Sequence, residues 1–199
     1  MGWLLYVIGY PGCGKTTAMK TALATLSPRG SERVERKPFA HTIHGCGLVE
    51  LGYDRETYGG TDTLPLNVQP KVVEWMNGTD VSLVIAEGDR LANPKFFDAV
   101  WNLSEREARE SETVPRRLCL VYIKCPELKA RQRAWERGSR FNESWLKGRI
   151  SKVDNLVNST LSERQSRESD RVRYEEIDGT EGYITVGAKL AEIIEGLNG

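Results

Sequence analysis

The chain has 199 residues, a length that suits one compact α/β domain better than two full domains. Its 28 basic and 28 acidic residues cancel, so no overall charge draws the protein to nucleic acid or to an anionic membrane, and any such attraction needs a local patch. The four cysteines have no metal-ligand spacing, which favours reduced thiols in a cytoplasmic protein over a zinc site.

Predicted strands and helices alternate along the chain. An apolar run predicts a strand over Trp3–Ile8, and a helix-forming stretch follows over Thr17–Leu26. The polar residues Ser27–Lys37 predict a loop, and a second strand is expected within Phe39–Leu51. The later predicted elements are a helix at Pro70–Met76, a strand at Val81–Ala86, a helix at Lys95–Arg109, a strand at Arg117–Ile123, helices at Glu127–Arg137 and Asn142–Glu163, a strand at Tyr174–Ile177 and a helix at Val186–Leu197.

The segment from Gly9 to Thr17 matches the phosphate-loop pattern in full, between the first predicted strand and the first predicted helix. Its glycines let backbone N–H groups surround the β-phosphate of ATP, Lys15 reaches the β and γ oxygens, and the Thr16 hydroxyl joins the shell of Mg²⁺. A plain glycine-rich turn is the alternative, but a lone lysine there opposes the helix dipole unless an anion is present. The expected ATP contacts are Gly9, Pro11, Gly12, Cys13, Gly14, Lys15, Thr16 and Thr17.

Strands that alternate with helices around a phosphate loop predict a parallel sheet covered on both faces. We therefore expect a single α/β domain over residues 1–199, a three-layer α/β/α P-loop NTPase of the nucleotide-kinase kind. The parallel sheet should have about five strands, and a basic helical lid should lie at about residues 127–152. In such sheets the ligand lies beyond the carboxyl ends of the strands.

The predicted strand at Val81–Ala86 runs into Glu87, Gly88, Asp89 and Arg90. Glu87 lies nearest to the strand end and is the expected acid that orders Mg²⁺, directly or through water. Asp89 is the second candidate, and Asp89 and Arg90 are also expected to border the acceptor. Alternatively, the two acids cap the following segment or pair with Arg90.

Two glycines and three short polar side chains follow one another from Gly59 to Thr63. Asp62 is the candidate general base or acceptor-orienting group, because a hydroxyl nucleophile must lose its proton during transfer. Gly60 and Thr61 are expected to border the same acceptor. An ordinary Asx-turn is the alternative for this segment.

Basic residues outnumber acidic ones between Lys129 and Lys152. They are Lys129, Arg131, Arg133, Arg137, Arg140, Lys147, Arg149 and Lys152. Arg133 and Arg137 are spaced to share a helix face and to point into one cleft, as the catalytic arginines of a mobile lid would. Arg140, Lys147 and Arg149 are expected to contact the acceptor. A solvated basic face is the alternative.

Aromatic residues interleave with these cations at Trp135, Phe141 and Trp145. Aromatic rings beside phosphate-binding cations can stack on single-stranded or flipped bases. Trp145 is therefore a candidate acceptor contact. Burial of one or two of these rings in the core is the alternative.

Several motifs occur in an order that resembles a group of phage-encoded small kinases, distant cousins of nucleoside and nucleotide kinases. These motifs are the phosphate loop, Gly59 to Leu64 ahead of Val68-Gln69-Pro70, Glu87 to Arg90, and Ser144 to Arg149. The resemblance runs from about residue 3 to about residue 157. The nearest named activity is 5-hydroxymethyluracil DNA kinase, which phosphorylates the hydroxymethyl group of the base within DNA as a step towards a hypermodified thymine.

The resemblance implies γ-phosphoryl transfer from ATP with Mg²⁺, in the cytoplasm of an infected host cell and without a membrane partner. The implied partner is DNA that carries a modified pyrimidine, flipped or single-stranded, because a base inside the duplex cannot reach a buried ATP. Downstream DNA-modification enzymes are further possible partners.

Two other functions stay open on the sequence. A deoxynucleoside monophosphate kinase would need only one or two arginines for its free acceptor, whereas a DNA kinase needs a basic track along several phosphates. A non-catalytic nucleotide switch would need no acceptor site at all. The sequence also leaves open the choice of triphosphate and the oligomeric state.

Overall fold

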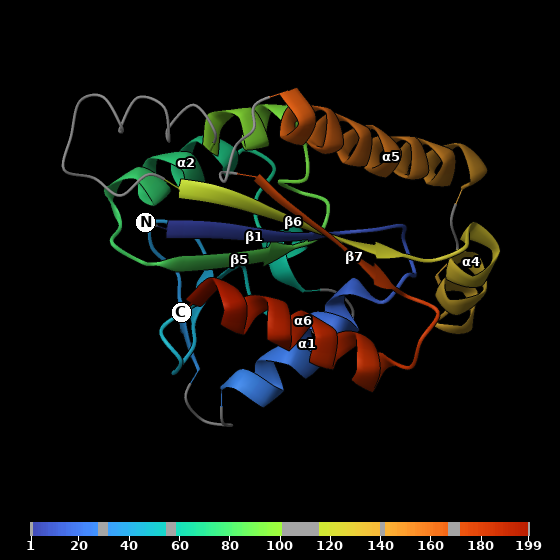
Figure 1. Ribbon diagram of the computed structural model, residues 1–199, viewed down its shortest axis with the longest axis horizontal. Helices are drawn as coiled ribbons and strands as arrows, with labels where there is room; N and C mark the ends of the chain where they lie inside the picture. Colours follow the sequence, from blue (N-terminus) through green and yellow to red (C-terminus); the bar gives the residue numbers. More distant parts are fainter. Residues whose placement is uncertain are drawn as a thin grey trace.

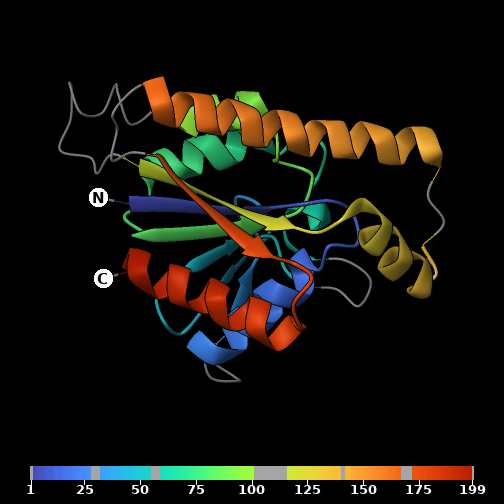
Figure 2. The ribbon, with the colours of Figure 1, turned by 45° about the vertical axis from the view of Figure 1, so that its right-hand side comes forward.

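A seven-stranded sheet forms the middle layer of the computed structural model, with helices on both of its faces (Figures 1 and 2). The structure describes residues 2–27, 32–54, 59–100, 116–139, 142–166 and 172–198. In their order across the sheet, the strands are β2 (Arg33–Glu35), β3 (His41–Ile43), β4 (Val49–Leu51), β5 (Leu83–Glu87), β1 (Gly2–Ile8), β6 (Arg116–Lys124) and β7 (Val172–Asp178).

The strands from β4 to β7 in this order pair in parallel, whereas β2 and β3 pair antiparallel beside β4. The predicted parallel sheet is therefore confirmed, but two details near its edge are wrong. Strand β2 lies within Ser27–Lys37, which was predicted as a loop, and the single strand predicted within Phe39–Leu51 is the pair β3 and β4. These strands have three residues each, too few to show a period of alternation.

Helices α2 and α5 cover one face of the sheet, and α1 and α6 cover the other (Figures 1 and 2). The helices are α1 (Lys15–Leu26), the 3₁₀ turn η1 (Gly60–Thr63), α2 (Gln69–Gly78), α4 (Glu127–Glu136), α5 (Glu143–Ser166) and α6 (Tyr183–Asn198). Residues 94–100 are helical too, and the rest of the helix predicted at Lys95–Arg109 lies outside the described residues. Within the described part of the chain, no helix has both the length and the apolar character needed to cross a membrane.

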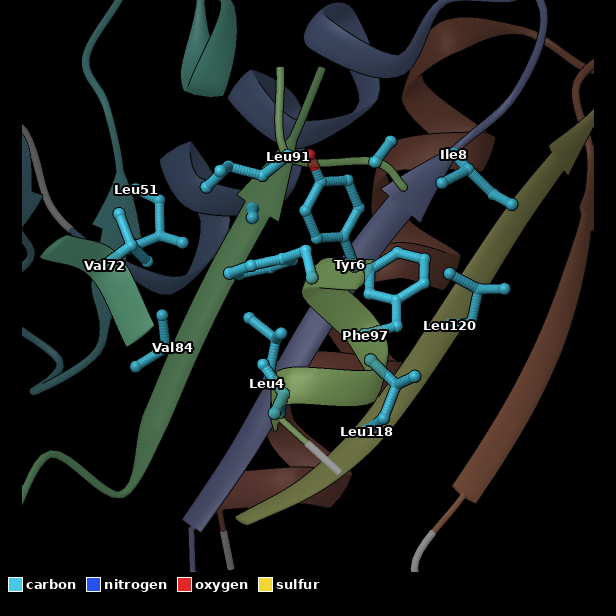
Figure 3. Packing of buried hydrophobic residues seen from close by; sticks show 14 of the residues in the cluster. Leu4, Tyr6, Ile8, Leu51, Val72, Val84, Leu91, Phe97, Leu118 and Leu120 are labelled. Carbon is cyan, nitrogen blue, oxygen red and sulfur yellow. The ribbon is translucent and has the colours of Figure 1, made fainter. Parts of the chain in front are cut away.

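Side chains of β1 alternate between two separate apolar clusters. Leu4, Tyr6 and Ile8 pack with residues of α2 and α5, as part of the cluster in Figure 3. Leu5 and Val7 pack with residues of α1 and α6. Burial on both faces explains why β1 is apolar throughout, because a central parallel strand has no solvent-facing side.

The register of the central strands places their carboxyl ends together. Val7 of β1 is level with Glu87 of β5, and Ile8 is level with Tyr122 of β6. The segments that follow these strands therefore start side by side at one edge of the sheet, where ligands of such folds bind.

Candidate active site

The phosphate loop connects β1 to α1, and its glycines meet two different needs. A Cβ atom on Gly12 would lie 2.1 Å from the backbone oxygen of Ala130, so only glycine lets the loop approach α4 this closely. Gly14 has open space around it but a φ of 99°, which L side chains rarely adopt. This left-handed residue turns the chain directly into the first turn of α1.

Lys15 is the first residue of α1, and its ammonium group folds back over the loop. The Nζ atom donates to the carbonyl oxygen of Gly9 at 2.9 Å and to that of Tyr10 at 3.2 Å. The first turn of α1 has no acidic residue, so its N–H groups and the helix dipole favour an anion there. The cation, the helix end and the loop together suit a phosphate group, and the space beside them is called the phosphate site below.

Glu87 and Thr16 meet beside this phosphate site. The Thr16 Oγ1 donates to the Glu87 Oε1 at 3.0 Å, and Glu87 is only 2% exposed. Burial raises the pKa of Glu87 from 4.5 to about 7, although Lys15 and the Thr16 hydroxyl act in the opposite direction. A buried carboxylate beside a hydroxyl is an oxygen pair that suits a hard cation.

Mg²⁺ fits this pair, provided that other molecules complete its shell. Among the residues that the structure describes, no three or more His, Cys, Asp or Glu side chains are grouped to hold a metal. Mg²⁺ commonly takes one or two protein oxygens and fills its octahedron with phosphate oxygens and water. Thr16 and Glu87 could supply the protein oxygens, as the sequence predicts.

A cavity of about 270 Å³ opens in front of the phosphate loop. The predicted site residues that line it are Gly9, Pro11, Gly12, Gly14, Lys15, Thr16, Thr17, Asp62, Glu87, Asp89, Arg137, Trp145 and Arg149. Lys152 lines it as well. Five segments of the sequence therefore meet around one space.

Cys13 is a predicted ATP contact that does not line this cavity. Its side chain is 2% exposed and packs in the cluster with α1 and α6, and its backbone N–H donates to the Tyr10 carbonyl. Cys13 therefore stabilises the loop from within, and its contact with ATP stays a prediction.

Asp62 lines the cavity, but it also holds the chain that follows β5. Its Oδ1 accepts the backbone N–H groups of Asp89 at 2.8 Å and Arg90 at 3.2 Å. An Asx-turn bonds its own neighbours, so this long-range contact differs from the alternative considered for the sequence. Asp62 has a positioning role whether or not it also orients an acceptor.

Gly60 and Thr61 pack behind Glu87 instead of facing the first cavity. Thr61 is fully buried, and its hydroxyl donates to the Glu87 carbonyl at 2.9 Å. Gly60 has a φ of 53°, and a Cβ there would lie 2.5 Å from the same carbonyl. Thr61 therefore does not line the first cavity, and its contact with an acceptor stays a prediction.

Helix α5 is tied to the site by charged and polar contacts. Asp89 pairs with Arg149 and with Lys152, whose Nζ lies 2.7 Å from the Asp89 Oδ1. Tyr10 of the phosphate loop donates to Asp154 at 2.8 Å. The alternative in which Asp89 pairs with Arg90 is thereby replaced by pairs to α5.

Lys152 belongs to the basic segment, but the sequence analysis assigns it no contact with ATP or the acceptor. Trp145, Arg149, Lys152 and Leu156 all line the cavity, and their spacing puts them on one face of α5. That spacing was the signal that could have identified Lys152. Trp145 is 43% exposed, and the Arg149 guanidinium lies 5.2 Å from its ring centroid.

The two predicted lid arginines do not share a cleft. Arg133 donates to the Gly179 carbonyl at 2.8 Å, away from the cavity, whereas Arg137 lines it. The reason is that α4 ends at Glu136, which makes Arg137 its C-cap residue. Residues four apart share a face only within a helix, so Arg133 and Arg137 are not aligned. Arg90 and Lys147 also lie outside the cavity lining, and Arg140 lies outside the described residues.

Much of the basic segment is engaged within the chain. Arg131 pairs with Glu127 and Glu143, and Lys129 donates to the Thr180 carbonyl. Trp135 is 82% exposed, so its burial in the core is excluded, and Phe141 lies outside the described residues.

A second cavity, of about 450 Å³, shares Thr16 and Glu87 with the first. It lies against α1 and the strands β2, β3 and β4, and Gly60 of η1 borders it. The Thr16–Glu87 pair therefore stands where two cavities meet.

Comparison with known proteins places these features in a family. The sequence pattern of the family described as P-loop Nucleotide Kinase3 matches residues 2–177. No curated protein sequence matches the chain significantly. One similar solved structure is an unliganded sugar kinase from Janibacter sp. HTCC2649, with a TM-score of 0.50, 10% identity, and coverage of 98% of this chain and 95% of that chain. At this identity, the similarity concerns the fold alone.

Proposed function

The chain belongs to the P-loop Nucleotide Kinase3 family, and on that premise we propose that it transfers the γ-phosphate of ATP to a hydroxyl group of its acceptor. The observation that carries the proposal is the contact of Thr16 with the buried Glu87, 3.0 Å apart beside Lys15 and open to two cavities. A phosphate site, a magnesium-competent oxygen pair and space for an acceptor thus adjoin one another.

The roles of the residues follow from their positions. Lys15 and the N–H groups of the loop bind the β and γ oxygens of ATP. To do so, the Lys15 ammonium gives up its hydrogen bonds to the Gly9 and Tyr10 carbonyls and binds phosphate oxygens instead. Thr16 and Glu87 would hold Mg²⁺, which when bound neutralises charge on the phosphate oxygens. Arg137 stabilises the charge on the transferring group.

The proposed acceptor is the hydroxymethyl group of 5-hydroxymethyluracil in DNA, with the base flipped or in a single strand. The order of the sequence motifs supports it, and so does the half-exposed Trp145 beside Arg149, an arrangement suited to base stacking. The phosphorylated base would then pass to downstream enzymes of thymine hypermodification in an infected host cell.

A free acceptor is the second candidate, and a specific observation favours it. Lys129, Arg131, Arg133, Arg149 and Lys152 already have partners within the chain, which leaves few cations for a track along DNA phosphates. This second candidate includes the deoxynucleoside monophosphate kinases. A non-catalytic switch has less support, because it would need no second cavity beside the Thr16–Glu87 pair.

The test is transfer of γ-labelled phosphate from ATP with Mg²⁺ to two sets of acceptors. One is DNA that contains 5-hydroxymethyluracil, with unmodified DNA as control, and the other is a panel of free nucleosides and nucleotides. Label on the modified DNA alone would establish the DNA kinase, and label on a free compound alone would establish the second candidate. Label on no acceptor, with ATP bound, would overturn the transfer reaction. Lys15→Ala serves as the inactive control, because removal of one such charge-stabilising group costs about 10²–10³ in kcat.

A further inference from the structure

The second cavity has a lining that is rich in hydrogen-bond acceptors. Its charged lining residues are Lys20, Glu32, Glu50, Asp54 and Glu87. The one cation, Lys20, pairs with Asp54 at 2.8 Å. The Thr42 hydroxyl is also engaged, as it donates to the Gly52 carbonyl at 3.0 Å. Carboxylates outnumber cations in this lining four to one, so a phosphate group there would meet mostly like charge.

His44 adds a buried polar atom with no partner to this lining. Its side chain is 2% exposed, and its Nε2 lies 3.3 Å from the Glu50 Oε2. Its Nδ1 has no hydrogen-bond partner. The nearest carboxylate oxygen, from Glu32, is 3.8 Å away. In the neutral ring that carries its hydrogen on Nε2 and donates it to Glu50, Nδ1 is an acceptor, and another acceptor such as Glu32 cannot satisfy it.

A buried nitrogen without a partner costs free energy unless a water molecule or a ligand supplies the missing donor. The donor must be an N–H or O–H group, and the surrounding carboxylates also accept hydrogen bonds from such groups. Glu32 has a side chain that is 50% exposed, so it can move aside as a ligand enters. The cavity is therefore chemically matched to a group that presents donors and carries no negative charge.

We propose that the second cavity binds the acceptor of this kinase, and that His44, positioned by Glu50, selects an uncharged group with N–H or O–H donors over a phosphate-bearing one. The imide edge of a pyrimidine and a polyol both have this chemistry. The inference rests on the proposed function for the transfer itself. Within that function it favours the free-acceptor candidate over DNA, in the form of an acceptor without phosphate.

This placement of the acceptor also brings its hydroxyl group to the γ-phosphate of ATP. An acceptor in this cavity presents its hydroxyl where the cavity meets the phosphate site, at Thr16 and Glu87. The hydroxyl oxygen forms the new bond to the γ-phosphorus, and the bond from that phosphorus to the bridging oxygen of ADP breaks. The hydroxyl proton leaves to a carboxylate or to water.

The first experiment measures binding separately from transfer. Calorimetry on the full chain loaded with Mg·ADP uses three probes: 5-hydroxymethyl-2′-deoxyuridine, its 5′-monophosphate and glycerol. We expect the nucleoside to bind, and the monophosphate to bind at least about tenfold more weakly because of the carboxylates. Equal or tighter binding of the monophosphate, or no binding of either uncharged probe, would overturn the inference.

The second experiment removes the unpartnered nitrogen. His44→Phe should weaken nucleoside binding at least about tenfold and leave the affinity for ATP unchanged, whereas His44→Asn, which keeps an acceptor near the Nδ1 position, should recover part of the loss. His41→Phe is the matched control, since His41 is buried nearby but does not line the cavity. Unchanged nucleoside binding in His44→Phe would count against the inference.

A third variant tests the charge of the lining without touching a buried residue. Glu32→Lys places a cation at the half-exposed position and should raise the affinity for the monophosphate at least about tenfold relative to that for the nucleoside. No such change would count against the inference. The two proposals also fail differently. If His44→Phe loses nucleoside binding but the wild type transfers no phosphate, the binding pocket is supported and the transfer reaction is rejected. If the wild type and His44→Phe transfer phosphate equally well, the transfer reaction is supported and the role of the pocket is rejected.

Discussion

Glu87 is a residue whose burial opposes its expected role. Its pKa is raised to about 7 because the buried site disfavours the charged carboxylate that Mg²⁺ needs. We expect the apparent affinity for Mg²⁺ to increase about tenfold per pH unit up to about pH 7 and to level off above it. Activity titrated with Mg²⁺ between about pH 5.5 and 8.5 measures this. Glu87→Gln should be weakly active and show no such dependence.

The same group should make the stability of the metal-free protein fall as the pH rises. Between 4.5 and about 7, the folded state holds a proton on Glu87 that the unfolded state has lost. The free energy of unfolding should therefore decrease across this window, by at most about 3 kcal/mol. Urea unfolding at several pH values measures it, with Glu136→Gln, an exposed glutamate, as the control. A stability difference between Glu87→Gln and wild type that does not vary with pH would contradict the assignment.

Asp62 combines a contact that the structure shows with a proposed chemical role, and two substitutions separate them. Asp62→Asn keeps an oxygen that can accept the N–H groups of Asp89 and Arg90, whereas Asp62→Ala removes it. We expect Asn to preserve Tm and ATP binding but to lower kcat about 10²-fold or more if the carboxylate orients or deprotonates the acceptor. Ala should also lower Tm. Wild-type turnover in Asp62→Asn would limit Asp62 to positioning.

The end of helix α4 determines which of its two arginines lines the first cavity. Arg137→Ala should lower kcat about 10–10³-fold with little change in the Kd for ATP, because its charge acts on the transferring group. Arg133→Ala is the matched control on the same helix: it should lower Tm through loss of the contact to Gly179 and leave kcat near that of the wild type. The opposite pattern would restore Arg133 as the lid arginine.

The sequence predicts the elements better than the contacts between them. The β1–loop–α1 unit is local, since glycine positions, lysine and helix start all lie within one short motif, and it forms as predicted. Helix α5 is held over the site by the ion pair of Asp89 with Arg149 and by the hydrogen bond from Tyr10 to Asp154. Each contact joins residues that are far apart in the chain. No local pattern specifies such pairs. The reassignment of Arg133 and Thr61 has the same origin, because each bonds a backbone carbonyl of a distant segment.

At the scale of the whole molecule, the zero net charge makes salt dependence a direct test of the acceptor. Each DNA phosphate neutralised by a cation contributes about 0.7 to the slope of log affinity against log salt for single strands. Of the described basic residues between Lys129 and Lys152, Arg137 and Lys147 are the two whose side chains make no hydrogen bond or close ion pair with another described residue, although Lys147 acts electrostatically on Glu143. We therefore expect a slope for DNA of about −1 to −2, far below that of a full basic track.

Lys147→Ala provides the variant for this test, because Lys147 is exposed and outside the first cavity. With a DNA acceptor, the substitution should reduce the magnitude of the slope by about 0.7 and leave the Kd for ATP unchanged. Lys189→Ala on α6, at the opposite face of the sheet from α5, is the control and should leave the slope as it is (Figures 1 and 2). A slope near zero would indicate an uncharged free acceptor. A slope steeper than about −5 would mean that α5 releases Arg149 and Lys152 from Asp89 when DNA binds.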